Sequence, residues 1–299
     1  MKILLLGKNG QVGWELQRSL MLLGELVALD RRGTDDLCGD ASNPDSLVAT
    51  VREVRPDVIV NAAAYTAVDR AEAEPDLAYT INATAPAVLA AEAAKLGAWL
   101  VHYSSDYVFD GSGIRPWQEE STARPLNVYG WSKLKGEEEI RASGCLHLIF
   151  RTSWVHSARG GNFARTILRL AEERETLNVI DDQYGAPTGA ELLADCTASA
   201  LHRASQSPSV SGTYHLTASG ETTWHGYAVH VIERANRTQL PFRLTPDGIR
   251  AVPSSAFITQ AQRPENSRLA TAKFRETFGL VLPDWRIGVN RTLDELLVP

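Results

Sequence analysis

The chain has 299 residues, of which 44% are hydrophobic, 22% charged and 7% aromatic. This composition is typical of a globular protein with material for one large or two modest domains, and it excludes disordered, collagen-like and coiled-coil classes. The formal net charge of −6 argues against a partner such as the phosphate backbone of a nucleic acid.

Neither a membrane segment nor a signal peptide is expected. The apolar run at residues 3–6 ends at Gly7, and the longest apolar region, residues 83–103, is interrupted by Glu92 and Lys95. The cysteines form no CxxC pair, which favours reduced thiols in a cytoplasmic protein. They are Cys38, Cys145 and Cys196.

Short apolar runs alternate with helical patterns along the first half of the chain. The expected strands are residues 2–6, 25–29, 57–61, 99–103 and 146–151, and the expected helices are residues 11–23, 45–54, 78–95 and 127–141. The strands are almost continuously apolar, as strands covered on both faces are. This alternation predicts an α/β fold with a Rossmann-like, doubly wound parallel sheet.

The second half is less regular. It contains weaker strand patterns at residues 177–180 and 212–216 and helical patterns at residues 162–174, 190–202 and 223–236. We therefore expect a Rossmann domain at residues 1–150 and mainly a smaller C-terminal, substrate-binding lobe at residues 151–299. This division allows helices after residue 162 to pack in the first domain.

A glycine-rich turn follows the first strand directly. Gly7, Gly10 and Gly13 have GxxGxxG spacing, one residue longer than the commoner GxGxxG. Such glycines allow a tight bend, let the backbone approach a pyrophosphate and permit close packing of helix on sheet. The helix N-terminus offers free N–H groups to the phosphates. A glycine-rich turn without a ligand is the alternative, and the strand–turn–helix context disfavours it.

Asp30 closes the second expected strand, 23 positions after Gly7. A carboxylate at this position accepts hydrogen bonds from both hydroxyls of an adenosine ribose, which favours NAD. Arg31 and Arg32 follow and are suited to the 2′-phosphate of NADP, so the choice between NADH and NADPH stays open. Gly39 and Asp40 come next, in a loop expected near the adenine.

Tyr129 and Lys133 form a YxxxK pair on an expected helix. Residues four apart share a helix face, so the ammonium is expected near the phenol, where it lowers the pKa of the tyrosine. Such a tyrosine can donate a proton while hydride moves. Ser105, after the fourth strand, offers a hydroxyl to polarise a carbonyl. The glycine turn at Gly7, Asp30 and Ser105 each follow an expected strand, so they are expected at the carboxyl edge of the sheet, which is where ligands bind in open α/β sheets.

Together these residues resemble the extended short-chain dehydrogenases/reductases, and within them the dTDP-4-dehydrorhamnose reductase family. The matching segments are NAAAYTAVD at 61–69, SSDYVFDG at 104–111, PLNVYG at 125–130, FRTSWV at 150–155, DQYGAPTG at 182–189 and RPENSRL at 263–269. They cover nearly the whole chain. The implied activity is NAD(P)H-dependent reduction of the C4 keto group of dTDP-4-dehydro-6-deoxy-L-mannose, the last step of dTDP-L-rhamnose biosynthesis.

The resemblance also implies roles for individual residues. Ser105, Tyr129 and Lys133 form the catalytic set, with Ser105 where the family usually has Thr, a mild departure because the donor is kept. Lys133 also holds the nicotinamide ribose. The implied cofactor contacts are Gly10, Gln11, Val12, Asp30, Gly39, Asp40, Ala64, Tyr65, Thr66 and Tyr103, and the implied substrate contacts are Asp106, Tyr107 and Trp154.

Some family members place Mg²⁺ at a homodimer interface with glutamates from each subunit. Glu15, Glu191 and Glu295 fall where such ligands are expected, and exposed helix acids are the alternative interpretation. Two other functions stay open at this point. One is a sugar-nucleotide epimerase or dehydratase with the same catalytic set, and the other is a regulatory subunit that binds a partner without turnover.

Overall fold

The computed structural model describes residues 1–34 and 36–297. A central parallel sheet has the strand order β10-β5-β4-β3-β1-β2. Its strands are β1 (Lys2–Leu6), β2 (Glu25–Leu29), β3 (Val58–Asn61), β4 (Trp99–Ser105), β5 (Leu146–Thr152) and β10 (Gly212–His215). The order reverses direction next to β1, so the carboxyl ends of β1 and β3 flank a crevice at the edge where ligands bind in this class of fold. The predicted doubly wound α/β fold is confirmed.

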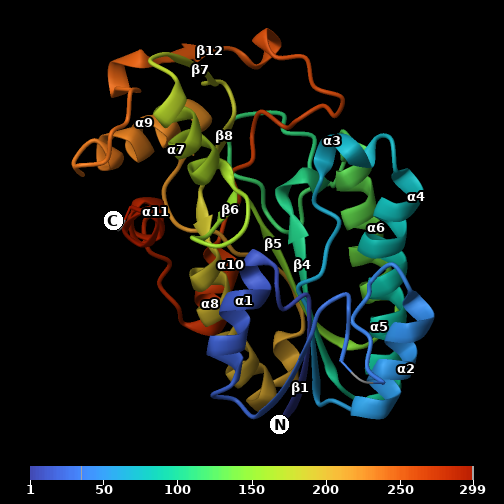
Figure 1. Cartoon of the computed structure of the whole chain (residues 1–299). Helices are drawn as coiled ribbons and strands as arrows, with labels where there is room; N and C mark the ends of the chain where they lie inside the picture. The colour runs from blue at the N-terminus through green and yellow to red at the C-terminus, as the bar shows by residue number, and fades with distance from the viewer. Residues whose placement is uncertain (35, 298–299) are drawn as a thin grey trace.

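Helices cover both faces of this sheet (Figure 1). On one face lie α1 (Gln11–Leu20), α8 (Ala190–Gln206) and α10 (Ala272–Phe278), and on the other lie α2 (Pro44–Val54), α5 (Ala85–Leu96) and α6 (Val128–Ala142). Two hydrophobic clusters fill the space between the layers, with Leu16 and Leu193 in the first and Leu47 and Leu89 in the second. Burial of both sheet faces explains why the strands read as continuous apolar runs.

The helix expected at residues 78–95 is interrupted. The chain forms α4 (Pro75–Tyr79), a π-helical turn at Thr80–Thr84 and then α5. Pro86 has no N–H to donate to the carbonyl oxygen of Asn82, four residues earlier, which removes one α-helical hydrogen bond. That oxygen faces α6, where a Cβ at Gly136 would lie only 2.1 Å from it. The wider turn therefore lets α6 pack closely.

The second lobe contains α7 (Phe163–Glu173), α9 (Trp224–Ala235) and α11 (Trp285–Leu296) around a third hydrophobic cluster. Three short strand pairs complete it. They are β7 (Leu177–Ile180) with β12 (Ile249–Val252), β6 (Val155–His156) with β9 (Thr188–Gly189), and β8 (Tyr184–Gly185) with β11 (Thr222–Thr223). In Figure 1 this lobe lies over the carboxyl edge of the central sheet, beside the short helix α3 (Val68–Ala71).

The chain crosses between the two lobes more than once. Helix α8 packs on α1, strand β10 pairs with β5, and Phe274 of α10 lies in the cluster under the sheet. A strand as well as helices from beyond residue 150 therefore belongs to the Rossmann layer. No helix in residues 1–34 and 36–297 is long and apolar enough to cross a membrane.

Candidate functional site: a dinucleotide pocket and an adjoining tyrosine centre

The glycine turn after β1 is shaped by close backbone contacts. Gly7 has φ +85°, a conformation that favours glycine, and its N–H donates to the carbonyl of Leu29 at 2.9 Å. A Cβ at Gly13 would lie 2.0 Å from the carbonyl oxygen of Gly7, so α1 packs against the turn with no room for a side chain. Gly10 precedes α1, which leaves the first N–H groups of that helix directed at the turn.

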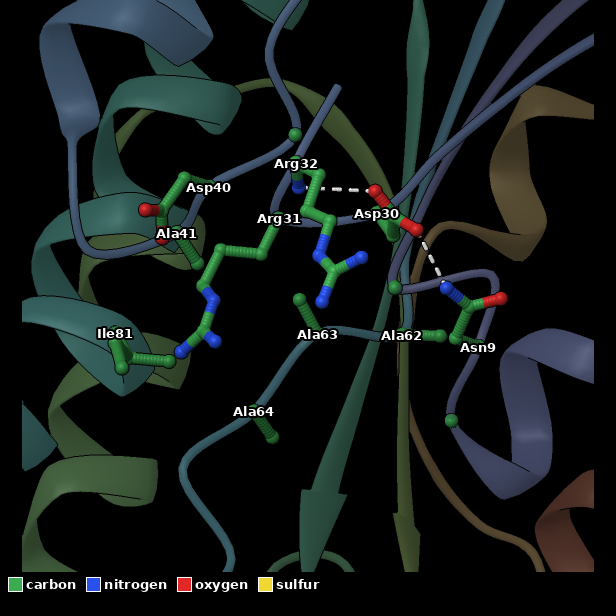
Figure 2. A pocket seen from close by; sticks show the side chains of 13 residues that line it. Asn9, Asp30, Arg31, Arg32, Asp40, Ala41, Ala62, Ala63, Ala64 and Ile81 are labelled. Atoms are coloured by element: carbon green, nitrogen blue, oxygen red, sulfur yellow. Dashed lines mark hydrogen bonds between the residues drawn. The ribbon is translucent and has the colours of Figure 1, made fainter. Parts of the chain in front are cut away.

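A cavity of about 610 Å³ lies beside this turn. Its lining comes from the segments that follow β1, β2 and β3, from the loop before α2 and from the π-helical turn, and comprises Gly7, Asn9, Gly10, Asp30, Arg31, Arg32, Gly39, Asp40, Ala41, Ala62, Ala63, Ala64 and Ile81. Figure 2 shows Arg32 extending toward Ala63 and Arg31 extending toward Ile81. The cavity therefore collects six of the residues expected to contact a dinucleotide, and its size and position suit one.

Asp30 is held at the rim of this cavity by two donors. Asn9 donates its amide N–H to Oδ2, and the backbone N–H of Arg32 donates to Oδ1 at 2.9 Å (Figure 2). The pKa of Asp30 lies below its usual value, chiefly because of the Arg32 N–H, and a smaller effect of burial opposes the shift. An ionised carboxylate thus faces the cavity with lone pairs left for hydroxyl donors.

Two further expected cofactor residues, Gln11 and Val12, open helix α1. The side-chain oxygen of Gln11 accepts from Asn162 at 3.0 Å and from Ser157 at 3.3 Å, which ties the dinucleotide turn to the second lobe. Tyr65 and Thr66 follow β3, and the backbone N–H of Tyr65 donates to the side chain of Asn82. The loop after β3 is therefore anchored to the π-helical turn.

Tyr103 lies differently from the other expected cofactor residues. Its ring is buried in the cluster between the sheet and α8, and its hydroxyl is 2.6 Å from the hydroxyl of Thr197. Because successive side chains of a strand point to opposite faces, this ring points away from α6. What Tyr103 offers on the α6 side is its carbonyl oxygen, which accepts from Lys133.

Ser105 and Tyr129 meet at the carboxyl end of β4. The hydroxyl of Ser105 donates to Oδ1 of Asp106 at 3.0 Å and accepts from the N–H of Tyr107 at 3.1 Å. Tyr129 lies in the first turn of α6, whose N-cap Asn127 accepts from the N–H of Gly130. Burial raises the pKa of Tyr129 to about 12, although a hydrogen bond with Ser105 partly offsets this effect.

Lys133 is one turn further along α6 and is buried. Its ammonium donates to the carbonyl oxygen of Tyr103, and Nζ lies 3.3 Å from Nε2 of His102. Burial lowers the pKa of Lys133 to about 8, while the nearby charge of Glu137 acts in the opposite direction. The expected lowering of the pKa of Tyr129 by Lys133 is wrong for this arrangement, because burial dominates and the lysine is turned toward β4.

Asp106 and Tyr107 continue from Ser105 into a one-turn 3-10 helix. Oδ2 of Asp106 is buried without a hydrogen-bond partner among the described residues, and burial raises the pKa of this carboxyl group to about 6. The ring of Tyr107 meets that of Tyr129 edge-on. A buried carboxylate oxygen without a partner, close to a phenol and a hydroxyl, is suited to accept a hydrogen bond from a hydroxyl group of a ligand.

Trp154 follows β5 with an unusual backbone, at φ +48°. Its ring stacks on Trp224 with centroids 3.6 Å apart, and a Cβ at Gly185 would lie 2.7 Å from the ring. The indole thus packs closely against two segments of the second lobe. Such strain persists where the surroundings hold it and is frequent at ligand sites.

Some residues of this region were not singled out from the sequence. Trp224 and Gln183, which share a hydrogen bond at 3.1 Å, support Trp154 from the second lobe. His102 lies under Lys133, and its only sequence signal is a polar residue inside an apolar strand. Arg263 belongs to the RPENSRL segment that the sequence did indicate, and its ion pair with Asp69 at 2.7 Å joins the second lobe to α3. Local periodicity contains no information on these contacts, because they join segments far apart in the chain.

The three glutamates considered as magnesium ligands lie on α1, α8 and α11. Burial raises the pKa of Glu191, and the charges of Glu15 and Glu295 raise it further. Within the described part of the chain, no group of three or more His, Cys, Asp or Glu side chains is arranged to hold a metal ion. Magnesium binding stays a prediction.

The fold and site together define an extended short-chain dehydrogenase/reductase: a Rossmann sheet with a glycine turn, a YxxxK helix beside the carboxyl end of β4 and a second lobe over that edge. The sequence pattern of the RmlD substrate binding domain matches residues 1–298. The chain therefore belongs to the dTDP-4-dehydrorhamnose reductase family, and the predicted membership in this family of oxidoreductases is confirmed.

Individual relatives agree with this assignment. The chain is 57% identical to a dTDP-4-dehydrorhamnose reductase of Escherichia coli (strain K12) over 99% of this chain and 98% of that protein. It superimposes on a crystal structure of a dTDP-4-dehydrorhamnose reductase from Clostridium acetobutylicum with a TM-score of 0.88, 32% identity and full coverage of both chains. A Bacillus anthracis dTDP-4-dehydrorhamnose reductase solved with NADP has a TM-score of 0.86 and 32% identity, covering 98% of this chain and 99% of that one.

Proposed function

We propose that the protein reduces the C4 keto group of dTDP-4-dehydro-6-deoxy-L-mannose to give dTDP-L-rhamnose. The observation that carries this proposal is the meeting of Ser105, Asp106 and Tyr129 at the carboxyl end of β4. Together with 57% identity to a reductase of this specificity, it favours reduction over the epimerase or dehydratase alternatives and over a binding subunit without turnover.

A nicotinamide dinucleotide supplies hydride in this reaction. In the proposed mechanism, the backbone N–H groups that follow Gly10 would donate hydrogen bonds to its pyrophosphate, and the carboxylate of Asp30 would accept hydrogen bonds from the hydroxyls of its adenosine ribose. Ser105 donates to the substrate carbonyl, Tyr129 protonates the developing C4 alkoxide, and Lys133 binds the nicotinamide ribose. Asp106 and Tyr107 hold the sugar ring, and Trp154 closes the site on the side of the second lobe.

The residues around Asp30 suit both NADH and NADPH. Two lone-pair positions of Asp30 are already used by Asn9 and Arg32, while Arg31 and Arg32 bring positive charge to the same rim. We therefore propose that the protein accepts both cofactors, in the cytoplasm. We further propose that a homodimer brings Glu15, Glu191 and Glu295 of two copies together and that Mg²⁺ binds there.

The experiment is an NADPH and NADH depletion assay on dTDP-4-dehydro-6-deoxy-L-mannose, with and without EDTA. A reductase consumes one reduced cofactor for each sugar, whereas an epimerase or dehydratase regenerates its cofactor within each turnover. Tyr129→Phe is expected to lower kcat by about 10² to 10⁴-fold while NADPH still binds. Undiminished kcat in Tyr129→Phe would assign the proton donor elsewhere, and no cofactor consumption by the wild type would reject the activity.

A further inference from the structure

A buried polar chain runs from the cofactor loop to Lys133. The N–H of Ala63, which lines the dinucleotide cavity, donates to Oδ1 of Asn61 at 3.2 Å. The amide nitrogen of Asn61 lies 3.2 Å from Nδ1 of His102, and Nε2 of His102 lies 3.3 Å from Nζ of Lys133. Asn61, His102 and Lys133 are each about 1% exposed, so water does not compete for these contacts.

Secondary structure places these three side chains in line. Asn61 and His102 are direct partners in the register of β3 and β4. Both therefore point to the same face of the sheet, the one that α6 covers. The side chain of Lys133 extends from α6 toward the sheet, where its Nζ meets Nε2 of His102.

The hydrogen bond from Ala63 determines which way the amide of Asn61 faces. Because Oδ1 accepts from a backbone N–H, the amide NH₂ group must be the part that meets His102. Nδ1 of His102 then accepts, and a neutral imidazole that accepts at Nδ1 carries its proton at Nε2. Burial keeps the imidazole neutral, with its pKa well below the usual value.

This tautomer directs an N–H group at Nζ of Lys133. An ammonium has only donors, so it cannot accept this N–H, whereas a neutral amine has one lone pair that can. The amine form can at the same time donate to the carbonyl oxygen of Tyr103. The arrangement therefore favours the neutral amine, whereas a protonated Lys133 keeps the carbonyl oxygen of Tyr103 as an acceptor but faces a second donor at Nε2 of His102.

We propose that Asn61 and His102 are positioning residues that select the protonation state and the resting position of Lys133. The proposal assigns them no contact with substrate, and it depends on the proposed function only in making Lys133 a working residue. The loop that lines the dinucleotide cavity and the lysine proposed to bind the nicotinamide ribose are then joined through one imidazole.

The charged groups around Lys133 leave this assignment intact. Glu137, one turn further along α6, favours the ammonium. Its carboxylate is, however, paired with Arg151 at 2.7 and 2.8 Å and with Arg141 at 3.0 Å, so its charge is largely balanced. Tyr129, one turn before Lys133, is neutral because burial raises its pKa. His102 is the titratable group of β4 that faces the lysine.

The first test observes the tautomer directly. Long-range ¹H–¹⁵N NMR of the ¹⁵N-labelled full chain distinguishes a protonated ring nitrogen from an accepting one, and the signal missing in His102→Gln assigns His102. We expect Nε2–H for His102 at pH 7. His147 and His215 serve as internal references with the opposite tautomer, because Nδ1 of each faces a backbone carbonyl, at 2.9 and 3.1 Å. An Nδ1–H tautomer or an imidazolium at His102 would overturn the proposal, whether or not the protein turns over substrate.

The second test reverses the tautomer. In Asn61→Asp, a carboxylate oxygen still accepts from Ala63, and the other accepts from His102, which moves the imidazole proton to Nδ1 and turns Nε2 into an acceptor for the ammonium. We expect the signals of His147 and His215 to stay unchanged, and the alkaline limb of kcat/KM to move up by about one pH unit or more. A lower kcat/KM with an unmoved limb and an unchanged His102 tautomer would show a merely structural role.

Discussion

Glu137 and Arg151 form a buried ion pair with two hydrogen bonds, from Nε to Oε1 at 2.8 Å and from Nη2 to Oε2 at 2.7 Å. Their side chains are 0% and 4% exposed, and the pair joins α6 to the end of β5. Burial acts to raise the pKa of Glu137, but the hydrogen bonds and charge of Arg151 outweigh it, so the pKa is lowered. The helix that carries Tyr129 and Lys133 is thus held to the sheet by this pair.

Removal of one partner of this ion pair should be strongly destabilising. Glu137→Gln leaves the Arg151 charge buried and uncompensated, and we expect a loss of about 3 to 5 kcal/mol in the free energy of unfolding, measured in urea at pH 7. Glu173→Gln, in an exposed pair with Arg169 at 3.7 Å, is the control and should change nothing measurable. Because the folded-state pKa of Glu137 is lowered, its contribution is present above the unfolded-state pKa and disappears as the pH falls. A Glu137→Gln variant as stable as the Glu173→Gln control would contradict this account.

A side chain at Gly13 should damage the dinucleotide turn. In Gly13→Ala the new Cβ meets the carbonyl oxygen of Gly7 at 2.0 Å, so the turn or helix α1 must move. We expect a loss of stability of about 1 to 3 kcal/mol and weaker binding of NADPH, measured by fluorescence titration. Gly161→Ala, with no atom within 4 Å of the new Cβ, is the matched control. Equal NADPH affinity in the two variants would show that the turn does not contact the cofactor.

The buried carboxyl group of Asp106 is expected to lower the free energy of unfolding at neutral pH, while it contributes to substrate binding. Burial raises the pKa of its carboxyl group to about 6, so the folded chain holds a proton that the unfolded chain releases at lower pH. Stability attributable to this group is therefore highest below the unfolded-state pKa near 4, decreases as the pH rises to about 6 and is constant above it. Asp106→Asn removes this dependence.

Thermal and urea unfolding between pH 4 and 8 measures this effect. Relative to the wild type, Asp106→Asn should gain up to about 3 kcal/mol between pH 4 and 6, the free energy that corresponds to a shift of this size. Its kcat/KM for the keto sugar should fall at the same time. The idea fails if the stability difference between the two proteins is the same at every pH.

Arg31 and Arg32 should determine how well NADPH competes with NADH. Both line the cavity at the end of β2, on the rim where Asp30 accepts from Asn9 (Figure 2). Because a guanidinium pairs with a phosphate but gains nothing from a ribose hydroxyl of NADH, Arg31→Ala and Arg32→Ala should raise the KM for NADPH by about tenfold or more and leave that for NADH almost unchanged. Steady-state kinetics with both cofactors tests this, and Arg169→Ala on the exposed face of α7 is the control. Parallel changes for both cofactors would assign the arginines a role other than recognition of the 2′-phosphate.

Much of the Rossmann layer was predictable from the sequence. The runs at Lys2–Leu6 and Glu25–Leu29 are strands with those bounds, and the helices after the glycine turn and around Tyr129 end within three residues of the expected positions. These elements could be found because their signals are local: continuous apolar runs, glycines at a strand end and a helical spacing of four between Tyr129 and Lys133. The same signals identified the family.

Only the tertiary structure decided which segments pair and what each buried side chain faces. The run at residues 212–216 joins the central sheet beside β5, whereas Leu177–Ile180 pairs with Ile249–Val252 outside it, although both look like strands. Lys133 faces His102 rather than Tyr129 because α6 packs over β4 in one particular register. Periodicity indicates which face of a helix or strand is buried, but not which other segment covers that face. That depends on long-range packing, and the protonation states of Tyr129, Lys133 and Asp106 depend on it in turn, since desolvation is a property of the assembled core.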